Sequence, residues 1–538
     1  MLFDAIPLEM LTEKDYKQLT EKGLTEKDVL RQVDFLKKGG SRPEILRTAS
    51  LEDGILDIPE DQQDAYLHVW DNYLGKKKTI VHFIPASGTA SRFLRELRAF
   101  MQADYETPQT NFEKNFFKHL ESFAFFTELN DLCKAKLKKK TEELIEEGQY
   151  KQILHYMLSE EGLNYGHLPI ALFKFHTDKG HRFATMEKYL PRRVMNYYSS
   201  FLEARTPIQE MMVESSMVSG TRGGVVNMCF TVNARHKDAI QEYLNSFKYP
   251  IEKRVGYEFS ISLPCQAEST DTVVLDENGE LLRDAEGKLV FHRGGHGALF
   301  EEFTSLHADL VYIKNIDNVP IDSLKRLTAR GNRLLGGVLV YHQKQIHKYL
   351  KRLEKGEIGD DQLIEIINYV ENVLNVKREN ILRMSREEQC SYLFDRLNRP
   401  LRVCSMVKNE DEQGGVPCWI RNNDGTMSLQ IVEYYQIYDH PKWKKMVAHA
   451  SHFNPVDMVC SMNDYKGHKF NFAKFADDSA VIVYPKEKDG RTVHQLEHPG
   501  LWNGCMAGWN TIFVELPVKT FNPVKNINDL LRQEHQIL

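Results

Sequence analysis

The chain has 538 residues, of which 42% are hydrophobic and 10% aromatic, and its formal net charge is −6. This composition is typical of a globular protein, and the length exceeds what one ordinary hydrophobic core supports. We therefore expect two or three domains or one elaborated core. The small net charge argues against nucleic acid as the main partner, because domains that bind nucleic acid carry clustered positive charge.

The sequence contains no run of about 18 apolar residues, so we expect no transmembrane helix and no membrane partner. Its first residues, Met-Leu-Phe-Asp-Ala, lack the basic and apolar regions of a secretory signal. The eight cysteines are scattered and include no Cys-x-x-Cys pair, which argues against a zinc site and a disulfide framework. Together these features predict a protein of the reducing cytoplasm.

The N-terminal segment, residues 8–75, has the pattern of helices. Residues 11–14 and 24–27 share the sequence Leu-Thr-Glu-Lys, which is typical of a helix start with a threonine cap and an acidic first turn. The repeat predicts two helix starts rather than a solenoid.

The core opens with the apolar run at residues 80–84, which predicts a buried strand. Residues 93–160 return to helical spacing. Their basic run at 134–140 is typical of a solvated face. From residue 165 to 320, short apolar runs alternate with glycine, proline and aspartate, which favours short strands joined by turns.

Three features stand out in that stretch. Residues 225–232 predict a strand, and residues 236–247 predict the helix that follows it. Two turn sequences, at 276–279 and 284–287, separate short strands and predict a hairpin. Residues 308–313 predict another buried strand.

Residues 321–400 have helical periodicity and no glycine-rich motif, which predicts a helical insertion. Strands resume after it, most clearly at 427–431 and 511–516. Strands that alternate with helices predict an α/β fold with a mostly parallel sheet. The expected divisions are a helical N-terminal segment, the first part of the core, the helical insertion and the second part of the core, at residues 1–75, 76–320, 321–400 and 401–538.

The loop after the first core strand is the strongest chemical signal. Residues 85–92 read Pro-Ala-Ser-Gly-Thr-Ala-Ser-Arg and join the strand to the first turn of a helix. Exposed backbone N–H groups and the positive end of a helix dipole favour an anion there, above all phosphate. Arg92 adds a charge suited to phosphate oxygens. The alternative is a tight turn with no ligand.

Two further segments carry glycine or acidic residues in suggestive positions. Residues 293–299 place His296 among three glycines, which let a bulky ligand or another backbone segment approach closely; the alternative is a hairpin exit loop. Asp317 follows a buried strand, where ligands bind in open α/β sheets, and its carboxylate suits Mg²⁺; the alternative is a polar turn with a helix cap. Asp457 could complete the metal site, and an Asx-turn is its alternative.

The last segment lies near the carboxyl terminus, where residues 521–531 read Phe-Asn-Pro-Val-Lys-Asn-Ile-Asn-Asp-Leu-Leu. Lys525 is a point charge that enters a helix. A lone lysine there is usually a surface residue, and only the surrounding pattern changes that interpretation.

Together these motifs resemble the UTP-dependent sugar pyrophosphorylases, which make UDP-glucose and UDP-N-acetylhexosamines. That family has a glycine-rich loop ending in Thr-Arg, a Pro-Gly-His-Gly loop, an Asn-Ile-Asp-Asn motif and a Phe-x-Pro-Val-Lys-x-x-x-Asp-Leu-Leu segment. Similar sequences occur here in the same order, at residues 86–92, 294–297, 315–318 and 521–531. Residues 429–434 also resemble the Val-Glu-Tyr strand of the hexosamine branch. Over its whole length the chain looks closer to an uncharacterised bacterial family, domain of unknown function 4301.

The resemblance implies a nucleotide-diphospho-sugar transferase fold, GT-A-like and Rossmann-like, in which a mixed, mostly parallel sheet is flanked by helices. It implies that Arg92 and Lys525 contact phosphates and that Asp317, with Asp457, holds Mg²⁺. The positions that it implies for nucleotide binding are Ser87, Gly88, Thr89, Ser91, Gly295, His296 and Gly297.

The chain also departs from that family. Ser87 and Ala90 replace loop glycines. The family's phosphate-binding lysine has a loose counterpart in Lys174, whose register differs. The chain ends soon after Lys525, which leaves no room for the carboxyl-terminal β-helix of the UDP-glucose branch.

We therefore expect a nucleotidyltransferase that forms a nucleotide-sugar from a nucleoside triphosphate, with UTP favoured, and a sugar 1-phosphate, with release of pyrophosphate. The alternative is a non-catalytic protein that binds nucleotide-sugars on the same scaffold. The sequence disfavours a glycosyltransferase, a P-loop enzyme and a metallohydrolase, because it lacks Asp-x-Asp, Gly-x-x-x-x-Gly-Lys-Ser/Thr and His-Glu-x-x-His. It leaves open the base, the sugar, the oligomeric state and the role of the helical segments.

Overall fold

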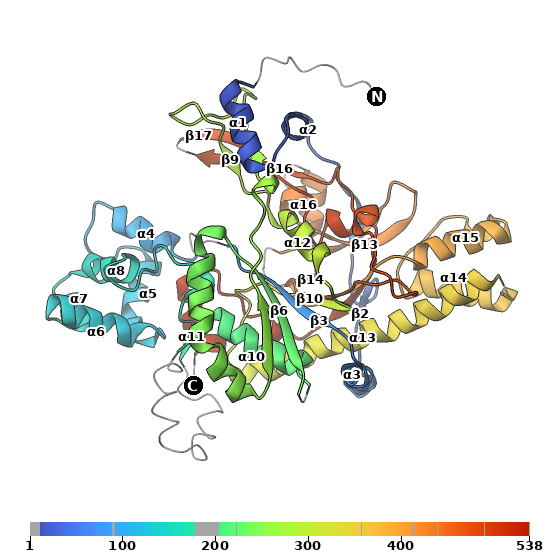
Figure 1. Cartoon of the computed structure of the whole chain (residues 1–538), viewed down its shortest axis with the longest axis horizontal. Helices are drawn as coiled ribbons and strands as arrows, with labels where there is room; N and C mark the ends of the chain where they lie inside the picture. The colour runs from blue at the N-terminus through green and yellow to red at the C-terminus, as the bar shows by residue number, and fades with distance from the viewer. Residues whose placement is uncertain are drawn as a thin grey trace. The chain divides into compact units, whose positions relative to one another are not determined.

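The chain divides into two compact units, and each is built from three separated stretches of sequence. The first unit contains Met1–Tyr73, Gln266–Val311 and Leu335–Leu516, and the second contains Leu74–Cys265, Tyr312–Leu334 and Pro517–Leu538. A computed structural model of the chain is shown in Figure 1. It describes residues 11–88, 92–177, 204–221, 223–356, 358–410, 414–437, 440–488 and 490–536.

The second unit contains three adjacent parallel strands. In order across the sheet they are β3 (Ile80–Pro85), β6 (Val225–Thr231) and β7 (Glu258–Ser262), with Val81 opposite Asn227 and Met228 opposite Ile261. Strand β3 forms where the sequence predicts it, because Ile80 to Ile84 are all buried, as expected of a parallel strand covered on both faces.

Two long helices pack on this sheet, as Figure 1 shows. They are α10 (Pro207–Ser219) and α11 (Lys237–Val255). Helix α11 extends past the predicted end at residue 247 and contains Pro250. It continues because Ile251 is 2% exposed and packs into the unit's main core. A short antiparallel pair is formed by β4 (His176–Thr177) and β5 (Ala204–Arg205), and β5 directly precedes α10 in the sequence.

A helical subdomain follows β3, as the periodicity of residues 93–160 predicts. Its helices are α4 (Arg95–Gln102), α5 (Asn111–Lys118), α6 (Phe126–Leu137), α7 (Thr141–Glu146) and α8 (Tyr150–Leu158). They enclose a core rich in phenylalanine, in which Phe116 contacts Phe117 edge-on at 5.1 Å between ring centroids. Edge-to-face pairs of this kind add to the stability that burial provides.

The first unit has its own parallel strands. Strand β18 (Asn510–Glu515) lies between β2 (Ile55–Leu56) and β11 (Leu401–Lys408) and is parallel to both. Strand β15 (Met458–Ser461) pairs with β11 in the antiparallel direction. The mixed, mostly parallel α/β class predicted from the sequence is therefore present in this unit as well.

A separate antiparallel sheet in the first unit has the strand order β1, β12, β13. These strands are β1 (Glu44–Thr48), β12 (Val416–Arg421) and β13 (Met427–Val432). The prediction that residues 8–75 are helical is therefore incomplete, because β1 and β2 both lie in that segment. Strand β1 forms because β12 supplies a partner about 370 residues away in the sequence, a pairing that local propensity does not reveal.

The helices of the N-terminal segment begin where the repeated Leu-Thr-Glu-Lys sequences predict. Thr12 caps α1 (Glu13–Lys22) and Thr25 caps α2 (Glu26–Lys38), each in a capping box with the aspartate three residues later. Helix α3 (Glu60–Leu74) follows β2.

The predicted helices at 321–400 are α13 (Asp322–Lys355), α14 (Asp360–Asn372) and α15 (Arg386–Leu397). The boundary between the two units falls inside α13, and also inside β10 (Leu310–Ile313). Among the described residues, none of the helices combines the length and the apolar character needed to span a bilayer.

The remaining elements of the first unit are short. Residues 276–279 and 284–287 form the predicted turns, and isolated bridges join Leu275 to Leu281 and Arg283 to Leu289. The other named elements are β8 (Thr272–Val273), β9 (Phe291–His292), α12 (Phe300–Ser305), α16 (Pro441–Ala448), β14 (His452–Phe453), β16 (Ile482–Lys488) and β17 (Arg491–Glu497).

Candidate active site

Three segments that are far apart in the sequence meet in the second unit. The backbone N–H of Val524 donates to the carbonyl oxygen of Asp317 at 3.0 Å. The N–H of Ile527 donates to the carbonyl oxygen of Phe93 at 3.2 Å. The loop after β3, the turn after β10 and the carboxyl-terminal segment are therefore hydrogen-bonded to one another.

A second contact joins the turn after β10 to the carboxyl-terminal segment. The side-chain oxygen Oδ1 of Asn318 accepts a hydrogen bond from the backbone N–H of Asn522 at 2.9 Å. Asn318 is 1% exposed, so this bond is protected from water. The Asn-Ile-Asp-Asn and Phe-x-Pro-Val-Lys motifs thus form one antiparallel contact, which also includes a bridge between Asn318 and Pro523.

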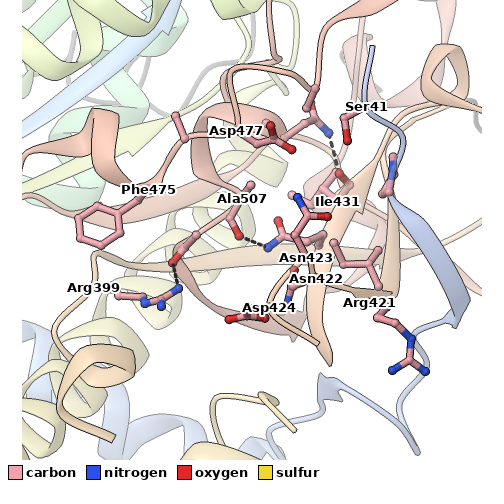
Figure 2. Close-up of a pocket in the computed structure, with 18 of the residues that line it drawn as sticks. Ser41, Arg399, Arg421, Asn422, Asn423, Asp424, Ile431, Phe475, Asp477 and Ala507 are labelled. Atoms are coloured by element: carbon pink, nitrogen blue, oxygen red, sulfur yellow. Dashed lines mark hydrogen bonds between the residues drawn. The ribbon is translucent and has the colours of Figure 1, made fainter. Parts of the chain in front are cut away.

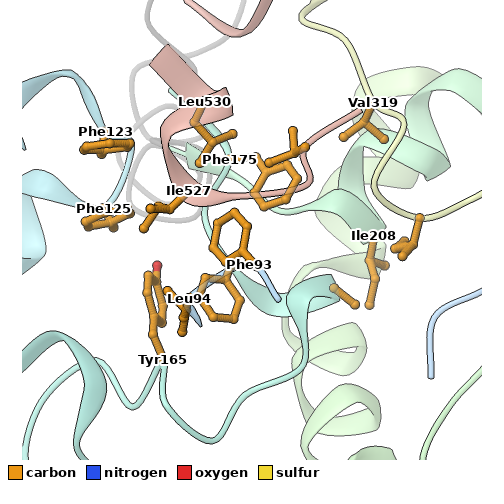
Figure 3. Packing of buried hydrophobic residues seen from close by; sticks show 14 of the residues in the cluster. Phe93, Leu94, Phe123, Phe125, Tyr165, Phe175, Ile208, Val319, Ile527 and Leu530 are labelled. Carbon is orange, nitrogen blue, oxygen red and sulfur yellow. The ribbon is translucent and has the colours of Figure 1, made fainter. Parts of the chain in front are cut away.

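Buried apolar residues next to the candidate residues belong to one hydrophobic cluster. Phe93, Val319 and Ile527 are each at most 2% exposed and pack in that cluster. Figure 3 shows these residues converging with Leu530 and Phe175. Phe93, Val319 and Ile527 each lie one or two positions along the chain from a candidate residue. Packing of this core therefore places the backbone of the three candidate residues in one region.

The charges around Asp317 are coupled. Burial raises the pKa of the Asp317 carboxyl to about 6, although the positive charges of Lys525 and Arg92 act to lower it. The carboxylate of Asp529 contributes to this rise in the pKa. Charges influence a pKa in this way when they lie near the titrating group. The charges of Arg92, Lys525 and Asp529 therefore act on the Asp317 carboxyl, and we name these four residues the Asp317 cluster.

Asp529 was not a candidate from the sequence, although the spacing of Asn526 and Asp529 is that of a capping box. It stands three residues after Asn526 in a capping box. Its Oδ2 accepts hydrogen bonds from the backbone N–H groups of Lys525, at 2.7 Å, and Asn526, at 2.8 Å. Asp529 therefore fixes the backbone from which the Lys525 side chain extends.

The small-residue loop after β3 is described only in part. Ser87 is half-buried and Gly88 is exposed, and a Cβ atom at Gly88 would meet no atom within 4 Å. Thr89 and Ser91 lie outside the described residues. Arg92, at the end of the loop, is exposed and so is accessible to a ligand.

Lys174 has its ion-pair partner in the helical subdomain. Its ammonium group forms an ion pair with the carboxylate of Glu128 on α6. Among the described residues, no hydrogen bond or ion pair joins Lys174 to the Asp317 cluster. Lys174, whose register differs from that of the phosphate-binding lysine of the pyrophosphorylases, therefore forms its ion pair with Glu128.

The candidate histidine motif around His296 lies in the first unit. The ring of His296 stacks on Trp502 with 3.8 Å between centroids and 13° between planes. Its Nδ1 accepts a hydrogen bond from the backbone N–H of Leu501 at 2.9 Å, and its Nε2 lies 3.1 Å from Oε1 of Glu433. The indole N–H of Trp502 donates to the same Glu433 oxygen at 2.8 Å. These contacts fix the orientation of both rings.

Glu433 is the carboxylate of the Val-Glu-Tyr strand. Burial acts to raise its pKa, but the electrostatic interaction with the His296 ring and the hydrogen bonds from His296 and Trp502 outweigh that effect, so the pKa of Glu433 lies below its usual value. The carboxylate is therefore held in its ionised form, in which it can accept hydrogen bonds only.

The glycines beside His296 accommodate the protein's own chain. A Cβ atom at Gly294 would overlap the carbonyl oxygen of Thr270, and one at Gly297 would overlap that of Pro499. Gly295 has φ +70°, a left-handed conformation that favours glycine. Of the two roles that the sequence allows for these glycines, the structure accounts for close approach of another backbone segment.

Asp457 also lies in the first unit, at the start of β15. It is 2% exposed, and its carbonyl oxygen accepts hydrogen bonds from the N–H and the hydroxyl of Ser405, both at 2.9 Å. An Asx-turn is present beside it, because Oδ1 of Asn454 accepts from the N–H of Val456 at 3.1 Å. Val456 has φ +63°, which is unusual for a β-branched residue and marks a constrained backbone.

The donor set of the Asp317 cluster suits a hard cation. In the part of the chain that the structure describes, no salt bridge engages the Asp317 carboxylate, and Asp317 remains partly exposed. Carboxylate oxygens with an accessible face are the ligands that Mg²⁺ prefers. No group of three or more His, Cys, Asp or Glu side chains in metal-binding geometry occurs among the described residues. A cation there would rely on Asp317 together with ligand oxygens.

Comparisons with known proteins give a family and a set of distant structures. The family model for a domain of unknown function, DUF4301, matches residues 12–196 and 188–536. No curated protein matches the chain. The chain is similar to a UDP-glucose pyrophosphorylase from Leishmania major, at 12% identity and a TM-score of 0.41 over 96% of this chain and 78% of that chain.

Two more solved structures are similar at the same level. One is a mutant of the Leishmania major enzyme in complex with UDP-Glc, at 11% identity and a TM-score of 0.42 over 99% of this chain and 82% of that chain. The other is a UDP-glucose phosphorylase from Trypanosoma brucei, at 12% identity and a TM-score of 0.43 over 98% and 80%.

Proposed function

The chain belongs to the family of the domain of unknown function DUF4301, and we propose that it transfers a nucleotidyl group from a nucleoside triphosphate to a sugar 1-phosphate. The observation that carries the proposal is the Asp317 cluster, where two cations and a carboxylate with a raised pKa meet. The motif resemblance to sugar pyrophosphorylases favours UTP as the donor.

In this reaction an oxygen of the sugar phosphate attacks the α-phosphorus of the triphosphate. The new P–O bond forms as the bond to the β-phosphate bridging oxygen breaks, and pyrophosphate leaves. The nucleophile is already an anion, so no side chain has to remove a proton. The barrier comes from repulsion between anions and from charge that grows on the leaving group, which fixed positive charge relieves.

The residues of the cluster supply that charge. Arg92 is exposed at the end of the loop and would bind the β- and γ-phosphates in a bidentate manner. Lys525 would bind phosphate as a point charge, from a backbone that Asp529 fixes. Asp317 would hold Mg²⁺, which when bound neutralises phosphate oxygens. Because Lys174 is paired with Glu128, we leave it out of this set.

The test is a panel of nucleoside triphosphates and sugar 1-phosphates with Mg²⁺, in which pyrophosphate release is measured. We expect one pair to support turnover and the Arg92→Ala variant to lose it. The matched control is Arg95→Ala, since Arg95 is an exposed arginine three residues away that pairs with Glu96. Equal turnover in the Arg92→Ala variant and the wild type would remove Arg92 from the mechanism.

A non-catalytic role in binding nucleotide-sugars is the second candidate. It is favoured by the loop at 294–297, whose glycines accommodate Thr270 and Pro499 of the protein itself. Isothermal titration separates the two functions. Binding of a UDP-sugar without pyrophosphate release in any combination of the panel would support the binding protein.

A further inference from the structure

A polar pocket in the first unit is not part of the proposed reaction. It has a volume of about 680 Å³, which lies in the range of small-molecule sites. Its walls come from the end of α15, the turn between β12 and β13, and the segments around Phe475 and Ala507. Figure 2 shows this pocket, with Arg399, Asn422 and Asp424 among the residues that line it.

The feature that distinguishes the pocket is a buried cation. Arg396 lines it at the end of α15 and is only 4% exposed. Its Nε is buried and makes no hydrogen bond, and no ion pair engages its guanidinium, within the described part of the chain. Guanidinium groups at this depth are normally paired, because an uncompensated buried charge is costly.

Charges of both signs surround Arg396. Burial, and to a smaller extent the nearby charge of Arg399, lower the pKa of Arg396 to about 10, although Tyr392, Asp424 and Asp395 act in the opposite direction. Asp424 is already engaged, since its Oδ1 accepts hydrogen bonds from the N–H and hydroxyl of Thr426. Across the whole lining, five cationic side chains face three acidic ones.

Arg399 also lines the pocket, and three contacts fix its side chain. Its Nη1 donates to the carbonyl oxygen of Gly508 at 3.3 Å, its Nε donates to that of Asp395 at 3.2 Å, and its Nη2 lies 3.6 Å from the Asp395 carboxylate. Figure 2 shows the first of these bonds. Each terminal nitrogen of Arg399 carries a second N–H, so Arg396 and Arg399 can both donate to one oxyanion in the pocket.

One unsatisfied acceptor accompanies these donors. Oδ1 of Asn398 is buried and has no hydrogen-bond partner among the described residues, and Asn398 lines the pocket. A ligand that satisfies both groups carries an oxyanion for the arginines and a hydroxyl donor for the amide oxygen. A dianionic phosphate also suits the excess of positive charge in the lining better than a carboxylate does.

We propose that this pocket binds a phosphate ester of a small hydroxylated molecule, with the phosphate held by Arg396 and Arg399 and a hydroxyl near Asn398. This site is separate from the Asp317 cluster in its residues, since none of the lining residues belongs to that cluster. Free phosphate and a sugar phosphate can both bind the two arginines. Only the sugar phosphate also has a hydroxyl group that can donate to the amide oxygen of Asn398.

The test titrates the full-length protein with inorganic phosphate, glucose 6-phosphate, glucose and citrate by calorimetry. We expect glucose 6-phosphate to bind most tightly, phosphate more weakly, and glucose and citrate not at all. The Arg396→Met variant should weaken binding about 10- to 100-fold, since it loses charge-assisted hydrogen bonds. The Arg383→Met variant, which changes an exposed arginine outside the pocket, is the matched control and should bind as the wild type does.

A second readout does not depend on ligand. Because Arg396 carries an uncompensated buried charge, Arg396→Met should raise the melting temperature of the ligand-free protein. If the melting temperature falls and glucose 6-phosphate still binds as tightly as to the wild type, Arg396 is a structural residue and the proposal is wrong. Binding of citrate without binding of either phosphate compound would also overturn it.

The proposed reaction is tested apart from this site by the Arg92→Ala variant. That variant should bind glucose 6-phosphate with unchanged affinity, because Arg92 is not in the pocket. Loss of this binding in Arg92→Ala, with retention in Arg396→Met, would assign the ligand to the Asp317 cluster and overturn the pocket proposal.

Discussion

Replacing Asp317 by asparagine should stabilise the metal-free protein at neutral pH. Burial raises the pKa of this carboxyl to about 6 in the folded protein, from its ordinary value of 3.8. The folded state therefore binds a proton more tightly than the unfolded state does between these two values. By linkage, stability falls as pH rises from about 4 to about 6, and the full penalty is present above pH 6. Asparagine resembles the protonated acid and avoids that penalty.

The size of the effect follows from the shift. A difference of about two pKa units corresponds to about 3 kcal/mol, which is an upper limit because Asp317 is partly exposed to solvent. For a folding unit of roughly 200 residues, each 1 kcal/mol changes the melting temperature by about 2–4 °C. The Asp317→Asn variant should therefore melt several degrees above the wild type at pH 8 and close to the wild type at pH 4.

The assay is differential scanning calorimetry in EDTA at pH 4, 5, 6, 7 and 8. The control variant is Asp131→Asn, which changes an exposed carboxylate on α6 and should give a small difference that does not vary with pH. The reasoning about Asp317 is refuted if the Asp317→Asn difference is flat across this range, or if the variant melts below the wild type at pH 8. Adding Mg²⁺ at pH 8 should raise the melting temperature of the wild type and leave that of Asp317→Asn unchanged.

Other variants test different parts of the molecule. Lys525→Ala should lower pyrophosphate release about 10²–10³-fold in the reaction that the substrate panel identifies, with the melting temperature kept. Lys314→Met leaves the Glu214 carboxylate buried without its ion-pair partner, so calorimetry should show a loss of about 3–5 kcal/mol, part of which the added Glu214→Gln change restores. Gly337→Ala places a Cβ atom against the Tyr66 carbonyl oxygen of α3, and urea unfolding should show a loss of about 1–3 kcal/mol.

The buried strands could be predicted because of how they are covered. Strands that are largely buried on both faces carry mostly apolar residues. Strand β10 is apolar throughout, and β3 and β6 each contain a single polar residue within an apolar run, His82 and Asn227. The two capped helices near the amino terminus were also predictable, since Thr12 and Thr25 satisfy backbone N–H groups within one turn of themselves. In both cases the information that determines the element lies within a few residues of it.

Elements that depend on distant partners were not predictable in this way. Strand β1 exists through its pairing with β12, and the two units are assembled from stretches that alternate along the chain. The pocket around Arg396 shows the same limit. An arginine near the end of a helix usually extends to solvent, and nothing in its neighbours along the chain predicts that it is 4% exposed.

The candidate site falls between these cases. Motif resemblance identified Arg92, Asp317 and Lys525, but only packing explains how they meet. Each is adjacent, or nearly so, to a residue of one apolar cluster, and the hydrogen bonds from Val524 to Asp317 and from Ile527 to Phe93 hold the segments in register. The charges themselves would separate in water, and burial of their apolar neighbours provides the free energy that brings them together. A site built in this way is preorganised before any polyanion binds, which is the property that phosphoryl-transfer chemistry requires.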